Sequence, residues 1–189
     1  MQSSTSQNVN ESYDDLNATS VIQPQALFFR ADSKIPNNPS LPVLVYRKVL
    51  DPNTADKDRV FKKHFEKSGW CGMWTGFIFD YHHFHTNTHE ALAIAKGHVR
   101  VMIGGDAGKE LDLQAGDLIV LPVGTGHKMV TSSENLVVVG AYPPGQKDYN
   151  ICKSVTECPD AQEEISNLAL PENDPFYGVP EPLRSFWKN

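Results

Sequence analysis

The sequence predicts an all-β fold, a small antiparallel barrel or jelly roll, and three observations support this. Short β-branched and aromatic runs recur between residues 73 and 142, separated by glycine-rich turns, a spacing typical of barrels and sandwiches. Apolar residues form 40% of the chain and charged residues 21%, as in ordinary globular proteins. The 189 residues suffice for one core and barely exceed one typical domain. We therefore expect one folded unit with a few short helices and an arm at each end.

The N-terminal part divides into a polar leader and the first elements of the barrel unit. Residues 1–20 are rich in Ser, Asn, Gln and Asp, and too poor in large apolar residues to offset the entropy of ordering. We expect a disordered leader there and the barrel unit over residues 21–150. Residues 26–29 and 43–46 read as strands, joined by a proline-stiffened loop.

A helix is predicted between residues 51 and 67. Asn53 or Thr54 offers an N-cap, and Gly69 offers a C-terminal stop. Helical spacing places one stripe of residues on the same side of this helix: Val60, Phe61, His64 and Phe65. We expect His64 to belong to this surface and not to bind a metal.

The remaining elements follow from the apolar runs. Strands are predicted over residues 73–85, 91–95, 99–103, 118–121, 128–131 and 136–142. Residues 151–189 are polar and proline-rich, with a helix predicted over residues 161–168 and an apolar end around Trp187. We expect this C-terminal arm to pack on the barrel.

Charge and cysteine content exclude several classes of protein. The formal net charge is −6 without a basic stripe, which argues against nucleic acid as a partner. We expect no membrane association, because no apolar run is long enough to span a bilayer, and no secretion, because no charged-then-apolar leader is evident. Three cysteines, Cys71, Cys152 and Cys158, match neither a CxxC pair nor a disulfide framework, so we expect a reducing, cytoplasmic location.

Four of the seven histidines lie between Tyr81 and Glu90. Residues at i and i+2 on a strand share a face, so His83 and His85 project together. Glu90 follows closely enough for a turn to bring its carboxylate to the same centre, and a second turn-rich segment ends at His127. These four residues are the predicted metal ligands.

Three imidazoles and one carboxylate suit Fe(II), Mn(II), Ni(II), Co(II) or Zn(II), and we place Fe(II) first. The cluster lacks cysteine, which favours a site with open positions and hence catalysis over a closed structural zinc site. Alternatives stay open: the histidines could only satisfy hydrogen bonds inside the barrel, or His89 could be a ligand or orient Glu90 from outside the ligand set.

Strand parity also predicts what surrounds the ligands. If residues 73–85 form one strand without a bulge, its alternate residues share the inner face with the metal. The predicted substrate pocket then contains Phe77, Phe79, Tyr81, Leu92, Ile94 and Met129. The Tyr81 hydroxyl is the candidate catalytic group, as an acid or as a donor to a metal-bound oxygen.

Both metal segments resemble the two signature motifs of the cupins. The first reads His-x-His-x4-Glu, then six residues and Gly97; the second reads Gly116, five residues, Pro-x-Gly, two residues and His127. Gly76 lies one residue too far from His83, and Thr131 replaces the usual Asn, but neither departure touches a ligand. The resemblance implies a double-stranded β-helix.

A wider resemblance, over residues 25–187, points to the YjlB-like cupins. It is carried by Lys34-Ile-Pro-Asn-Asn-Pro, by Tyr81-His-His-Phe-His and by Leu170-Pro-Glu-Asn-Asp-Pro-Phe-Tyr-Gly. The resemblance implies a soluble protein and favours a homodimer.

Three functions are compatible with these observations. The first is a metal-dependent oxygenase of the dioxygenase type acting on a small organic molecule. The second is an isomerase, epimerase or cyclase that uses the metal only as a Lewis acid. The third is a non-catalytic small-molecule-binding cupin, because fold does not determine function. An apolar pocket favours an aromatic or polyketide-like molecule over a sugar phosphate.

Overall fold

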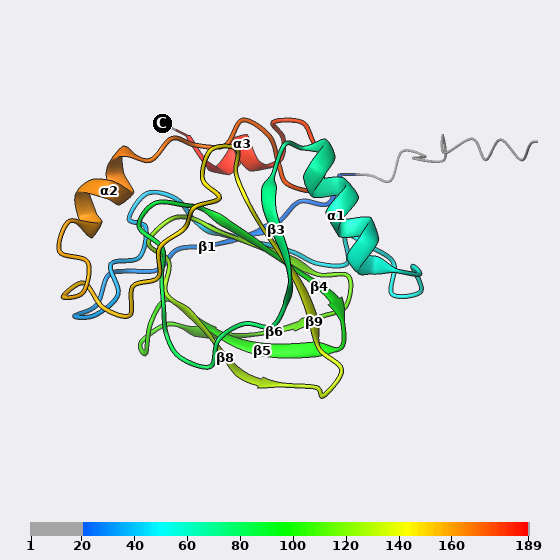
Figure 1. Cartoon of the computed structure of the whole chain (residues 1–189), viewed down its shortest axis with the longest axis horizontal. Coiled ribbons are helices and arrows are strands. Elements are labelled where there is room, and N and C mark those ends of the chain that lie inside the picture. Colours follow the sequence, from blue (N-terminus) through cyan, green and yellow to red (C-terminus); the bar gives the residue numbers. More distant parts are fainter. Residues whose placement is uncertain (1–20, 189) are drawn as a thin grey trace, which may run out of the picture.

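The computed structural model describes residues 21–188 and folds them into two antiparallel sheets that face each other across a shared interior (Figure 1). The larger sheet has the strand order β1-β2-β7-β4-β9-β3, and the smaller has the order β6-β5-β8. Their bounds are β1 Gln25–Leu27, β2 Val43–Tyr46, β3 Cys71–Gly76, β4 Glu90–Lys96, β5 His98–Ile103, β6 Lys109–Gln114, β7 Leu118–Leu121, β8 His127–Ser132 and β9 Val137–Tyr142. The all-β prediction is confirmed. The predicted disordered leader, residues 1–20, lies outside the described residues.

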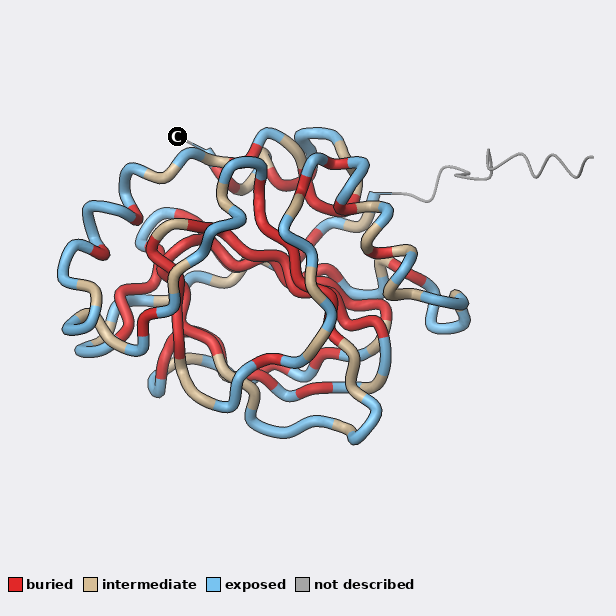
Figure 2. The backbone as a smooth tube through the Cα atoms, in the orientation of Figure 1, coloured by how far each residue is buried: buried red, intermediate tan, exposed pale blue. Residues whose placement is uncertain are grey.

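The central strands of the larger sheet are buried on both faces (Figure 2). Their alternate side chains fill two separate cores, which is why these strands read as continuous apolar runs in the sequence. The inner core, between the sheets, includes Val43, Val45, Leu92, Ile94, Ile119, Leu121 and Val138. The outer core, on the opposite face, includes Leu44, Tyr46, Ala91, Ala93, Leu118, Val120, Val139 and Ala141.

Helix α1 (Lys57–Lys67) and the C-terminal arm cover this outer core (Figure 1). Phe61 and Phe65 supply the buried face of the helix. The predicted caps Asn53 and Thr54 are wrong, because Thr54 donates its N–H to the Asp51 carbonyl at 3.0 Å in a turn before the helix. The N-cap is Asp56, whose left-handed φ of 47° turns the chain into the helix.

The segment predicted as one strand over residues 73–85 is divided in the structure. Strand β3 ends at Gly76 in the larger sheet, whereas His83 pairs with His127, the first residue of β8 in the smaller sheet. Between them, Phe79 accepts a hydrogen bond from the Met129 N–H at 2.8 Å. The chain crosses from one sheet to the other, and a regular strand cannot pair in both.

Strand β6 was not predicted. Leu111 and Leu113 alternate with charged and polar residues along it, and both are buried against the inner core. This alternation is a strand pattern, but it is short and lies among glycine and charged residues. Tertiary pairing of β6 with β5 completes the strand.

The C-terminal arm carries α2 (Ala161–Asn167), one residue shorter than predicted, and α3 (Leu183–Phe186). The cysteine spacing predicts no disulfide, and the structure corrects this: Cys152 and Cys158 are bonded, with their Cα atoms 6.2 Å apart, and Cys71 is free. Sequence spacing alone cannot show that two cysteines converge across a turn. Among residues 21–188, no helix is long and apolar enough to cross a membrane.

Candidate metal centre

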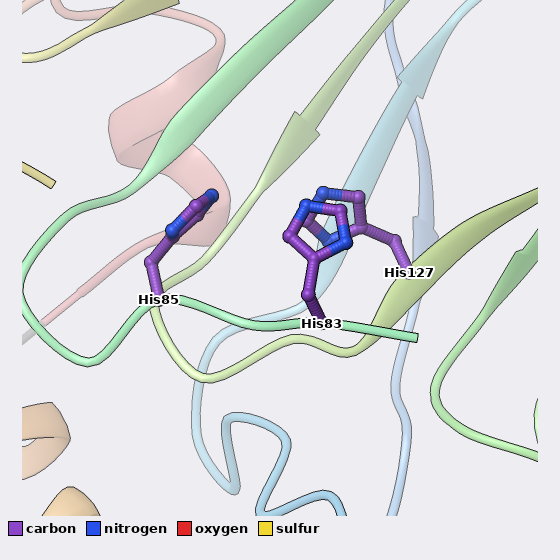
Figure 3. A group of neighbouring side chains, drawn as sticks. All are labelled: His83, His85 and His127. Atoms are coloured by element: carbon purple, nitrogen blue, oxygen red, sulfur yellow. The ribbon is translucent and has the colours of Figure 1, made fainter. Parts of the chain in front are cut away.

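Three buried histidines converge where the two sheets meet (Figure 3). His83 and His85 lie on the segment that crosses between the sheets, and His127 begins β8. Reciprocal backbone hydrogen bonds of 3.2 and 3.0 Å join His83 to His127, and their ring centroids lie 4.1 Å apart. The three histidines each present one nitrogen, and these nitrogens all lie within 4.8 Å of one another.

The hydrogen bond at Nδ1 determines which ring nitrogen of each histidine carries a free lone pair. The Nδ1 atom of His83 faces the Tyr81 carbonyl at 3.3 Å, that of His127 faces the Thr125 carbonyl at 3.1 Å, and that of His85 faces the Asn150 carbonyl. A carbonyl only accepts, so each neutral ring donates its Nδ1–H outward. The Nε2 lone pairs are then free for a metal, as in second-shell hydrogen bonding of histidine ligands.

Glu90 supplies a carboxylate to the same centre. It is the first residue of β4 and is 4% exposed. Its Oε2 lies 3.4 Å from His85 Nε2 and 3.2 Å from His127 Nε2, but neither Oε2 nor His85 Nε2 has a partner in hydrogen-bonding geometry. Buried polar atoms are nearly always satisfied. These unsatisfied, convergent atoms fit a divalent transition metal.

Electrostatics at the cluster favour an anionic Glu90 beside a neutral His83. Burial, together with His127 and His85, lowers the pKa of His83 to about 3. Burial alone would raise the pKa of Glu90, yet the neighbouring His85 and His127 hold it below its usual range. Burial disfavours a charge on His85, but Glu90 outweighs this effect and raises the pKa of His85.

A cavity of about 250 Å³ opens beside the four candidate ligands. Of the predicted pocket residues, Phe77, Phe79 and Leu92 line it. Their neighbours in the lining were not predicted: Trp74, Ile78, Tyr142 and Tyr149. Phe77, Ile78 and Phe79 are consecutive, so the period of two that underlies the sequence prediction does not hold along this crossing segment.

The structure places Tyr81, Ile94 and Met129 outside the cavity lining. The Tyr81 ring stacks on Phe79 at 5.0 Å, and the Lys153 Nζ atom lies 4.6 Å from the ring centroid. The Tyr81 backbone carbonyl faces His83 Nδ1, and a catalytic role for its hydroxyl stays a prediction. Ile94 and Met129 pack in the inner core.

His89 points away from the three histidines and is fully buried elsewhere. Its Nδ1 accepts a hydrogen bond from the Val123 N–H at 3.0 Å, and its ring lies 4.7 Å from Trp187. Val123 belongs to the turn that precedes His127. His89 therefore connects the start of β4, this turn and the C-terminal arm.

Alternation along strands could have revealed two of the unpredicted residues. Tyr142 shares a face of β9 with the inner-core residue Val138, and Trp74 pairs with Gly140 across β3 and β9. Tyr149 lies in a loop without such a pattern. It is positioned because Asn150 exchanges two hydrogen bonds with Thr86, of 2.9 and 2.6 Å.

Comparisons with known proteins define first a class and then a family. The family model described as a cupin domain matches residues 70–142, which contain all four candidate ligands. The uncharacterized protein YjlB of Bacillus subtilis (strain 168) is 39% identical over 166 residues, 87% of this chain and 97% of YjlB. The chain belongs to the cupins and, within them, to the YjlB-like family.

Solved structures resemble the chain at greater distance. Acireductone dioxygenase from Bacillus anthracis, with cadmium in its active centre, is 19% identical over 55% of this chain and 79% of that one, with a TM-score of 0.39. A dTDP-4-dehydrorhamnose 3,5-epimerase from Elizabethkingia anophelis is 12% identical over 68% of this chain and 76% of that one, with a TM-score of 0.38. Likenesses this distant assign no substrate or reaction to this chain.

Proposed function

We propose that this protein is a metal-dependent oxidoreductase of the dioxygenase type that acts on a small, flat, apolar molecule. The observation that supports it best is the set of three imidazoles with outward-bonded Nδ1 atoms around the unsatisfied Oε2 atom of Glu90. His83, His85, Glu90 and His127 would hold the metal, with Fe(II) as the first candidate. When bound, such a metal supplies Lewis acidity and electron transfer to oxygen.

The chain supplies binding and exclusion of water around this centre. Aromatic side chains dominate the cavity, and the rings of Tyr142 and Tyr149 stack at 4.7 Å. Flat aromatic walls favour a planar substrate. Among residues 21–188, no Lys or Arg lines the cavity, so no permanently cationic side chain there would neutralise a phosphate or a nucleotide diphosphate. Lys96, the basic residue that follows Glu90 at the end of β4, is exposed.

Partly exposed aromatic side chains line the cavity beside the candidate metal centre. Phe77 is 64% exposed, and Phe79 and Tyr149 are about 40% exposed, all at one cavity. The candidate histidine ligands are shielded from solvent, because His83, His85 and His127 are each 5% exposed or less. A substrate that covered these aromatic groups would seal the ligands from bulk water, which strengthens every electrostatic interaction inside.

Metal analysis of the protein, purified without chelators or an affinity tag, tests the proposal. We expect about one equivalent of iron in the wild type and its loss in the His83→Ala and Glu90→Ala variants. Oxygen uptake with small phenols and enols then tests the reaction class. Iron with no oxygen uptake, or bound nickel, manganese or zinc, would favour Lewis-acid isomerisation. If the protein binds none of these metals, the enzyme proposal is refuted and a binding protein is favoured.

The cytoplasmic location and the homodimeric state stay predictions from the sequence. Light scattering on the purified protein tests the second, because a dimer has twice the chain mass of 21.0 kDa.

A further inference from the structure

Tyr142 is a buried tyrosine at the candidate metal centre, and its hydroxyl oxygen accepts one hydrogen bond. It ends β9, is 1% exposed and lines the cavity. The Trp74 Nε1–H donates to its hydroxyl oxygen at 2.9 Å. An indole nitrogen donates but cannot accept. The Tyr142 O–H must therefore donate to a different partner.

Gly140 makes this arrangement possible. Trp74 and Gly140 are cross-strand partners on β3 and β9, and the indole ring packs against the glycine. A Cβ atom at Gly140 would overlap the indole ring, including Nε1. The missing side chain at residue 140 thus lets the indole N–H reach the Tyr142 hydroxyl.

The pairing of β4 with β9 places Glu90 next to Tyr142. Ala91 is the partner of Ala141 in this antiparallel register, so Glu90 and Tyr142 are the next residues opposite each other. Side chains opposite each other on one face have Cβ atoms about 4.5–5.5 Å apart, and both of these line the same cavity. Burial raises the pKa of Tyr142, and the neighbouring charge of Glu90 raises it further.

We propose that Tyr142 is a positioning residue for the metal ligand Glu90. The Trp74 N–H orients the Tyr142 hydroxyl, whose O–H donates to the Glu90 carboxylate and holds the Oε2 atom toward His85 and His127. This inference rests on the metal centre proposed above. Carboxylate ligands are commonly hydrogen-bonded in this way, and losing such a partner typically lowers metal affinity by about 10–100-fold.

Cobalt(II) binding to the metal-free protein tests the inference without any assay of activity. The affinity is measured in competition with a chromophoric chelator, and the visible absorption of bound Co(II) reports its coordination. We expect Tyr142→Phe to weaken Co(II) binding by about 10–100-fold and to alter the spectrum. Trp74→Phe should weaken binding less in the wild-type background and not at all in the Tyr142→Phe background.

Tyr46→Phe is the matched control. Tyr46 is also buried and also donates to a carboxylate, Asp174 at 2.5 Å, but in the outer core. The control removes the same atom from a similar setting, so it should lower the stability and leave Co(II) affinity and spectrum unchanged. A general structural effect of losing a buried hydroxyl would instead weaken Co(II) binding in both variants, which would overturn the inference.

Failure of the inference and failure of the metal centre give different results. If Glu90→Gln and His83→Ala lose Co(II) while Tyr142→Phe binds it like the wild type, the inference is overturned and the metal centre stands. If Glu90→Gln and His83→Ala also bind like the wild type, both are overturned. If circular dichroism shows that Tyr142→Phe does not fold, Trp74→Phe decides: weaker binding supports the inference, and wild-type affinity overturns it.

Discussion

Replacing His89 by leucine distinguishes a structural histidine from a metal ligand. In the structure His89 is fully buried and accepts the Val123 N–H, which is itself inaccessible to water. Leucine has no acceptor, so this N–H becomes unsatisfied, at a cost of about 1–3 kcal/mol. For a chain of this size the cost corresponds to a fall in Tm of about 2–12 °C. Metal content should stay at the wild-type level, because His89 lies outside the convergent cluster.

Two measurements on one preparation check this prediction. Urea denaturation of the metal-free protein gives the free energy of unfolding without a contribution from bound ligand, and mass spectrometry gives the metal content. His89→Asn is the control, since its amide oxygen retains an acceptor near the position of Nδ1. Loss of metal in His89→Leu, equal to that in His83→Ala and with stability within about 0.5 kcal/mol of the wild type, would refute the structural role.

Three further predictions concern stability. Trp187→Phe removes the donor to the Pro42 carbonyl at 2.8 Å and should cost about 1–3 kcal/mol of unfolding free energy in urea; no change would contradict this. Reducing the bond between Cys152 and Cys158 opens a short loop and should cost about 2 kcal/mol, with free thiols rising from one to three; three thiols before reduction would refute the disulfide. Burial lowers the pKa of His64 below 6.5, so the unfolded state binds more protons and stability should fall as pH drops below about 6.5; a His64→Gln variant with the same pH dependence of the urea midpoint would contradict this.

The metal ligands could be proposed from the sequence because their spacing is local. His83 and His85 are two residues apart, and Glu90 follows after one turn. The two-residue repeat of a strand and the metal-binding character of these side chains were enough to group them, and the family resemblance supported the addition of His127. The larger sheet was predictable for a related reason: strands buried on both faces must be apolar throughout, as in β2 and β7.

The cavity wall could not be predicted in the same way. Its prediction assumed that residues 73–85 form one strand, whereas the chain leaves one sheet at Gly76 and joins the other at His83. Parity is lost wherever a segment changes sheet, so Phe77, Ile78 and Phe79 all reach the cavity while Tyr81 lies outside the lining. Tyr149 comes from a loop held by Asn150, and no local pattern encodes that contact.

The all-β class, the cupin motifs and the set of candidate ligands could be read from the sequence, because they depend on residue type and short-range periodicity. Tertiary contacts were needed to establish the direction of each lone pair, the position of His89 away from the centre, the pairing of Cys152 with Cys158, and the cross-strand placement of Tyr142 beside Glu90. These features arise from contacts between segments far apart in the chain. Such contacts depend on register and packing, which a single sequence does not display.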